Sequence, residues 1–123
     1  MLFRIILQKV YAVPVYVLLA IGAFYRRLDK LDEALEIYSV ALTKIGTQQT
    51  PISFEILSSI GGVLTQQKKY KQAEAAYRQV YKVKERVLGK EHLDTLMSMK
   101  NLRRSLQNQG KHAKAKVIFR QAL

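Results

Sequence analysis

The sequence lacks cysteine and contains only two histidines, His92 and His112, in 123 residues. Without cysteine the chain has no disulfide scaffold, no thiol nucleophile and no cysteine-ligated metal site. Two histidines are too few for an all-histidine metal centre. We therefore expect no metal and no cofactor. The absence of cysteine also fits a reducing compartment, so we expect a cytoplasmic protein.

Acidic residues are also few, at 9 Asp and Glu against 21 Lys and Arg, and the net charge is +12. Hydrophobic residues make up 49% of the chain, which is enough for the packed core of one domain. Residues 1–67 hold six basic and five acidic side chains, whereas residues 68–123 hold fifteen and four. This basic half keeps open a partner such as nucleic acid or an acidic membrane surface.

Long hydrophobic runs are missing apart from one, the sixteen uncharged residues from Val10 to Tyr25. A spanning helix needs about 20 apolar residues, and Pro14 lies inside this run, so we expect no stable membrane insertion. A signal peptide or membrane anchor within residues 1–25 is the alternative, because a basic start, an apolar centre and small residues are all present. A buried helix with Pro14 near its first turn is favoured, because a repeat uses the same residues.

Three segments align without a gap: Leu18–Leu42, Leu57–Tyr81 and Met99–Leu123. Apolar residues at spacings of three, four and seven place one stripe along a first helix in each segment. A polar turn follows, and then a second helix with an alanine and an aromatic residue four positions later. The alanine lets two helices approach closely and the aromatic fills the space one turn on. These pairs are Ala34 and Tyr38, Ala73 and Tyr77, and Ala115 and Phe119.

Alternation typical of strands never persists, so the sequence predicts an all-α fold. We expect a leading segment over 1–12, the end of a preceding helix, and a repeat domain over 13–123. The expected helix pairs are 14–28 with 31–46, 51–67 with 70–88, and 94–109 with 112–123, in units of about 14–46, 51–88 and 94–123. Thr50 and Asp94 are expected N-caps, Pro51 a first-turn proline, and Gly89 a helix stop.

The frame resembles the tetratricopeptide repeat, a helix–turn–helix unit with the pattern large-x2-Leu-Gly-x2-Tyr followed by Ala-x3-Phe/Tyr. The segments Leu88-Gly89-Lys90-Glu91-His92, Asn101-Leu102 and Gln109-Gly110-Lys111 are similar to the kinesin light chain type of this repeat. The resemblance implies a right-handed α-solenoid of about three stacked units.

The candidate catalytic residues are Glu91, His92 and Asp94. They lie in the linker between two units, where turn and cap chemistry is the favoured interpretation. The chain has no Gly-rich phosphate loop, and Gly61-Gly62 is interpreted as helix packing. We expect no enzyme.

The resemblance implies a non-catalytic protein–protein interaction module whose first helices line a concave groove. Lys100 and Arg104 lie four residues apart and suit a carboxylate or phosphate, so an acidic segment is the expected partner. A solvated helix face is the competing interpretation. By similarity, the peptide-binding residues are Leu19, Ala23, Arg26, Arg27, Ser58, Gln66, Lys100, Asn101, Arg104 and Asn108.

The alternative function is a basic surface that binds nucleic acid or anionic lipid non-specifically. The second helix of the second unit carries basic residues on one stripe, although Glu74 is placed to pair with one of them. The neighbouring tyrosines, Tyr70, Tyr77 and Tyr81, have core spacing, whereas base stacking needs exposed aromatics. The basic residues are Lys71, Arg78, Lys82 and Arg86.

The last unit shows no polar capping helix, and its apolar residues Ile118, Phe119, Ala122 and Leu123 would have a bare side. Two explanations fit. The chain is a fragment of a longer solenoid, or it self-associates through uncapped solenoid ends.

Overall fold

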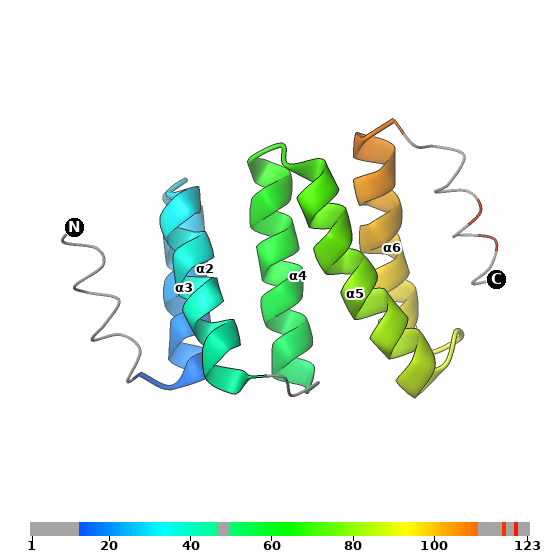
Figure 1. Cartoon of the computed structure of the whole chain (residues 1–123), viewed down its shortest axis with the longest axis horizontal. Coiled ribbons are helices and arrows are strands. Elements are labelled where there is room, and N and C mark those ends of the chain that lie inside the picture. The colour runs from blue at the N-terminus through cyan, green and yellow to red at the C-terminus, as the bar shows by residue number, and fades with distance from the viewer. Residues whose placement is uncertain (1–12, 47–49, 111–116, 118–119, 121–123) are drawn as a thin grey trace. The chain divides into compact units, whose positions relative to one another are not determined.

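The computed structural model describes residues 13–46, 50–110, 117 and 120, and these residues contain helices and no strand (Figure 1). The all-α prediction is therefore confirmed. The predicted leading segment 1–12 lies outside the described residues, as does the helix expected at 112–123 apart from Val117 and Arg120. The helices are α2 (Val15–Arg27), α3 (Leu31–Ile45), α4 (Pro51–Gln66), α5 (Tyr70–Leu88) and α6 (Leu93–Asn108).

The chain divides into two compact units, one ending at Val63 and the other beginning at Leu64. In the first, α2 and α3 lie side by side, and their apolar stripes meet in a buried cluster that α4 completes. Gly22 lies against Tyr38, since a Cβ added to the glycine would be 2.7 Å from the ring. The missing side chain of Gly22 therefore gives the aromatic ring of α3 room to pack against α2. The buried members are Leu18, Ala34, Ile37, Tyr38, Ala41, Ile56 and Val63.

The second unit contains the α5–α6 pair, whose core holds Tyr81, Met99, Leu102 and Leu106. Tyr77 packs against the same cluster. Both tyrosines therefore serve the interior, as their spacing predicted.

The polar turns share one backbone feature, a residue with positive φ. It falls at Asp29 (φ 61°), Lys68 (φ 62°) and Gly110 (φ 75°), which is the same position of each repeat. In the first two turns a backbone N–H reaches back five residues, from Lys30 to Tyr25 over 2.9 Å and from Lys69 to Leu64 over 2.8 Å. These bonds satisfy carbonyls at the helix end, so each turn closes a tight helical hairpin.

Two predicted helix ends are confirmed and one is wrong. The Thr50 hydroxyl accepts from the N–H of Ser53 over 3.4 Å, while the Ser53 hydroxyl accepts from the N–H of Thr50 over 2.9 Å. This reciprocal pair caps α4 before Pro51. Gly89 ends α5 with φ 89°. Asp94, however, is not the N-cap of α6. His92 caps it, because its Nδ1 accepts from the N–H of Asp94 over 3.1 Å, and Asp94 lies in the first turn.

The helices of the described residues do not meet the requirements of a membrane span. None of them is both long enough and apolar enough to cross a bilayer.

Candidate binding surface

The outward face of α6 carries a graded stripe of exposed side chains. The helix buries Met99, Leu102 and Leu106 on the opposite side. From its beginning to its end, the exposed face runs from apolar residues through cations to an amide. We call this set the α6 face, and it consists of Leu93, Met97, Lys100, Arg104 and Asn108. Asn101, at its edge, is half-buried.

The two cations of the α6 face are available to a ligand. Lys100 and Arg104 are exposed and one helical turn apart, and neither forms an ion pair with any residue that the structure describes. Arg78 on α5 differs, because its guanidinium lies 2.9 Å from the carboxylate of Glu74, as the spacing predicted. Two adjacent cations without a carboxylate partner attract an anionic group.

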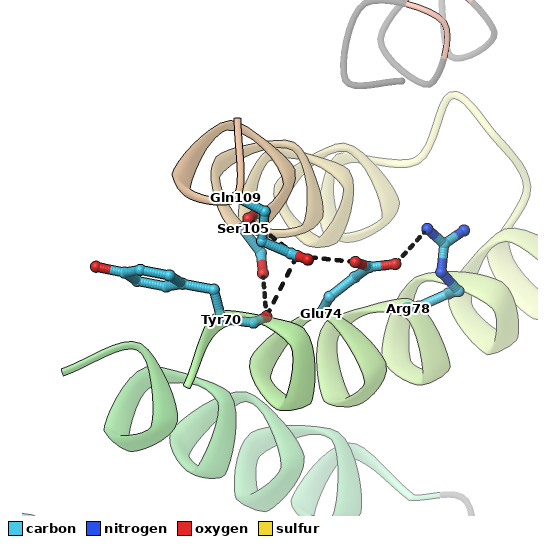
Figure 2. A network of polar contacts seen from close by, with 5 residues as sticks. All are labelled: Tyr70, Glu74, Arg78, Ser105 and Gln109. Carbon is cyan, nitrogen blue, oxygen red and sulfur yellow. Dashed lines mark hydrogen bonds and ion pairs between the residues drawn. The ribbon is translucent and has the colours of Figure 1, made fainter. Parts of the chain in front are cut away.

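The inner side of α6 is held by polar contacts to α5, drawn in Figure 2. The Ser105 hydroxyl donates to the Tyr70 carbonyl over 3.1 Å, and the Gln109 amide donates to Glu74 over 2.8 Å. Glu74 in turn pairs with Arg78. The α6 face therefore belongs to a helix that is fixed to its neighbour, so the spacing of the residues along it is set by the fold. The sequence analysis did not predict this network. Its signal in the sequence is that Ser105 and Gln109 are polar residues on the side of α6 that faces α5.

The predicted residues of α2 differ in exposure. Arg27 is exposed, whereas Leu19, Ala23 and Arg26 are half-buried and Leu19 packs against the core cluster. The Arg26 guanidinium lies over α4, since a Cβ on Gly62 would be 2.8 Å from two of its nitrogens. On α4, Ser58 is half-buried and Gln66 is exposed. Arg26 thus contributes to packing as well as to charge.

Sequence reasoning missed two exposed apolar side chains beside this set. Phe24 is 59% exposed and Leu28 is 50% exposed. Phe24 was passed over because the repeat pattern assigns a role to its neighbour Tyr25, whose ring meets that of Phe24 edge to face at 6.3 Å. The positions of Phe24 and Leu28 along α2 place both side chains away from the buried apolar stripe.

The linker histidine serves the backbone. The Nδ1 of His92 accepts the hydrogen bond that caps α6, and Glu91, His92 and Asp94 are all exposed. Among the described residues, no group of three side chains of His, Asp or Glu is placed to hold a metal ion.

Two tyrosines have perturbed acidity. Burial, followed by a hydrogen bond with Glu85 and the charge of that carboxylate, raises the pKa of Tyr81 to about 12. Burial also raises the pKa of Tyr38, against the opposing effects of a hydrogen bond with Ser59 and the charge of Arg26. Both phenols stay protonated at neutral pH, so they act as packing groups.

Helical hairpins with a repeated positive-φ turn and a close contact between glycine or alanine and an aromatic define a helical-repeat protein. The family model described as tetratricopeptide repeat matches residues 53–123, more than half of the sequence. The chain belongs to the tetratricopeptide repeat family. Repeats of this family generally form non-catalytic scaffolds that mediate protein–protein interaction.

Solved structures share the fold. The nearly identical repeats described as a kinesin light chain from Podosopora anserina superpose with a TM-score of 0.77 at 18% identity, over 88% of this chain and 52% of that one. BtubC from P. vanneervenii superposes with a TM-score of 0.60 at 15% identity, over 88% of this chain and 61% of that one. The chain thus spans little more than half the length of these proteins. No curated protein sequence matches it.

Proposed function

We propose that this chain binds an acidic segment of a partner protein, and that the α6 face is the centre of the site. One observation carries the proposal. Lys100 and Arg104 are exposed one turn apart and form no ion pair with any described residue. A hydrogen bond to a charged group contributes about 1.5–3 kcal/mol, so two such cations suit a carboxylate pair.

The remaining groove residues have supporting roles in this proposal. Asn101 and Asn108 offer amides to the backbone of an extended segment, and Leu19 and Ala23 offer apolar contact. The first helices of the helix pairs supply the groove residues in this family, which supports including residues of α2 and α4 in the proposal beside those of α6. The other members of the proposed groove are Arg26, Arg27, Ser58 and Gln66.

A charge-reversal experiment tests the site. The probe is a fluorescent peptide of alternating Glu and Leu, with the Gln-for-Glu peptide as its neutral counterpart. Binding is measured by fluorescence anisotropy for the wild type, for Lys100→Glu/Arg104→Glu, and for Lys82→Glu/Arg86→Glu. The last variant is the matched control, because it reverses a Lys and an Arg with the same spacing on α5 and changes the net charge equally.

We expect the α6 variant to weaken binding of the acidic peptide at least about tenfold, the loss of one such contact. The α5 variant should weaken it far less. Equal losses in the two variants would mean that the peptide responds to overall charge, and would refute the α6 assignment.

The second candidate function is non-specific binding of nucleic acid or anionic lipid by the cations of α5. Lys71, Lys82 and Arg86 are exposed, which favours it. Against it, Tyr77 packs on the core and Tyr81 is buried, so these aromatics are not presented for base stacking. Binding to random single-stranded DNA that survives about 300 mM salt, and that Lys82→Glu/Arg86→Glu abolishes, would establish this function. The same salt series with vesicles of phosphatidylserine tests the lipid.

A further inference from the structure

A row of apolar side chains runs along the outside of α2. Tyr16 is 68% exposed, Phe24 is 59% exposed and Leu28, at the C-cap, is 50% exposed, with exposed Ala20 between the aromatics. The four residues follow one another at intervals of four, so they share one side of the helix. We call this row, Tyr16, Ala20, Phe24 and Leu28, the α2 row. Single exposed apolar residues are common, but a continuous row marks an interaction surface.

Charge favours a second copy of this chain as the occupant of the α2 row. Helix α2 contains no acidic residue, and its basic residues Arg26 and Arg27 lie in the last turn. Residues 1–63 hold six basic and five acidic side chains, whereas residues 64–123 hold fifteen and four. The two first units of such a pair carry almost no net charge, so little repulsion opposes their contact.

Shape favours the same occupant. In a two-fold pairing of antiparallel α2 helices, residue i of one copy faces residue j of the other, and j faces i. A pairing centred at the level of Gly22 sets Phe24 of each copy opposite Ala20 of the other. It sets Tyr16 opposite Leu28, and Arg27 near the ring of Tyr16. Phe24 then meets the small side chain of Ala20, and the cation of Arg27 lies near an aromatic ring.

We propose that the α2 row is a homodimer interface in which two α2 helices pack antiparallel, with Phe24 of each copy over Ala20 of the other. This interface uses none of the α6 face. It does bring Arg27, a member of the proposed groove, to the other copy. The two tests remain distinguishable, because the charge reversal at Lys100 and Arg104 leaves the α2 row intact and the variants of Ala20 and Phe24 leave the α6 face intact.

An exchange of the two side chains tests the proposal on the full chain. Sedimentation equilibrium over about 1 µM to about 1 mM protein, at about 0.3 M salt to screen repulsion, measures the dimer dissociation constant. Phe24→Ala removes the large partner from both halves, and Ala20→Phe sets large against large. Ala20→Phe/Phe24→Ala restores one large and one small residue at each contact. Val87→Ala is the control, because Val87 is 67% exposed on α5.

We expect a reversible dimer, an increase of about tenfold or more in the dissociation constant for each single variant, recovery in the double variant, and no change for Val87→Ala. All three substituted positions are exposed, and circular dichroism checks that each variant folds. A wild type that is monomeric throughout the range overturns the proposal. So does a dimer indifferent to Phe24→Ala, or a double variant no better than the singles, which would mean that another protein, a lipid surface or residues 1–12 covers the row.

Discussion

Two glycines show that the surroundings of a residue determine what the same substitution does to stability. Gly22 and Gly62 both lie inside helices, where glycine costs about 1 kcal/mol relative to alanine. A Cβ at Gly22 would lie 2.7 Å from the Tyr38 ring, which is buried on every side. A Cβ at Gly62 would lie 2.8 Å from the Arg26 guanidinium, the end of a flexible side chain. The ring cannot move aside, whereas the guanidinium can.

The same substitution should therefore have opposite effects at the two sites. Gly22→Ala should lower the free energy of unfolding by about 1–3 kcal/mol, because overpacking outweighs the gain in helix propensity. Gly62→Ala should leave it unchanged or raise it by up to about 1 kcal/mol. Urea denaturation followed by circular dichroism measures both. A Gly22→Ala variant as stable as the wild type would show that the Tyr38 ring is free to shift.

The acidity of Tyr81 predicts how stability changes in alkali. Its pKa in the folded chain is about 12, against an ordinary value of 10.0, so the folded state holds the phenol proton more tightly than the unfolded state. The resulting stabilisation is complete below pH 10 and is lost as the pH rises from 10 to 12. Tyr81→Phe has no proton to lose, so its stability should fall less steeply over that range.

The control for this experiment is Tyr16→Phe, since the Tyr16 side chain is 68% exposed. Thermal melts at intervals between pH 9 and pH 12 compare the three proteins. Parallel decline of wild type and Tyr81→Phe would contradict the assignment, and so would a flattened profile for Tyr16→Phe.

Among the elements, the α5–α6 pair depends on polar as well as apolar contacts. The Gln109 amide reaches the carboxylate of Glu74 over 2.8 Å, the carbonyl of Ser105 over 3.3 Å and that of Tyr70 over 3.4 Å (Figure 2). It thereby joins the end of α6 to the beginning of α5. Groups that are already committed to such a network lose their partner when one member is removed.

Gln109→Ala should therefore lower the free energy of unfolding by about 1–2 kcal/mol. Gln107→Ala, an exposed position of the same helix, should have almost no effect. Chemical denaturation of the two variants gives the comparison. Equal effects would mean that the amide of Gln109 is as well satisfied by water as by α5.

The helices themselves were predictable because their signals are local. Apolar spacing, Pro51 and Gly89 placed all five described helices to within one residue at each end, but the N-cap of α6 lies two positions before the expected Asp94. The exception at that boundary has a physical cause. Aspartate is a more frequent N-cap than histidine, but here the imidazole of His92 accepts the hydrogen bond from the N–H of Asp94 and therefore caps the helix.

For the whole molecule, the charge of +12 acts against compactness. Fifteen of the 21 cations belong to residues 68–123, and like charges confined to a folded unit repel one another. Salt shortens the range of this repulsion, from about 30 Å at 0.01 M to about 10 Å at 0.1 M.

Stability should therefore increase with salt. The melting temperature should rise by roughly 3–5 °C between 0.01 M and 0.1 M NaCl, the equivalent of about 1 kcal/mol. Lys82→Glu/Arg86→Glu lowers the net charge by four units and should show a smaller rise. A melting temperature that falls with salt would mean that attractive ion pairs outweigh the repulsion.

The sequence by itself determined the repeat, the helices and the family, because apolar periodicity, turn residues and close small–aromatic contacts act over a few residues. It also singled out Lys100 and Arg104, since one helix turn sets their spacing. The tertiary structure decided which side chains remain open. Leu19 and Arg26 are half-buried, whereas Phe24 is exposed. Arg78 forms an ion pair with Glu74, whereas no described carboxylate pairs with Lys100. Exposure and pairing depend on neighbouring elements, and a pattern along one helix does not contain them.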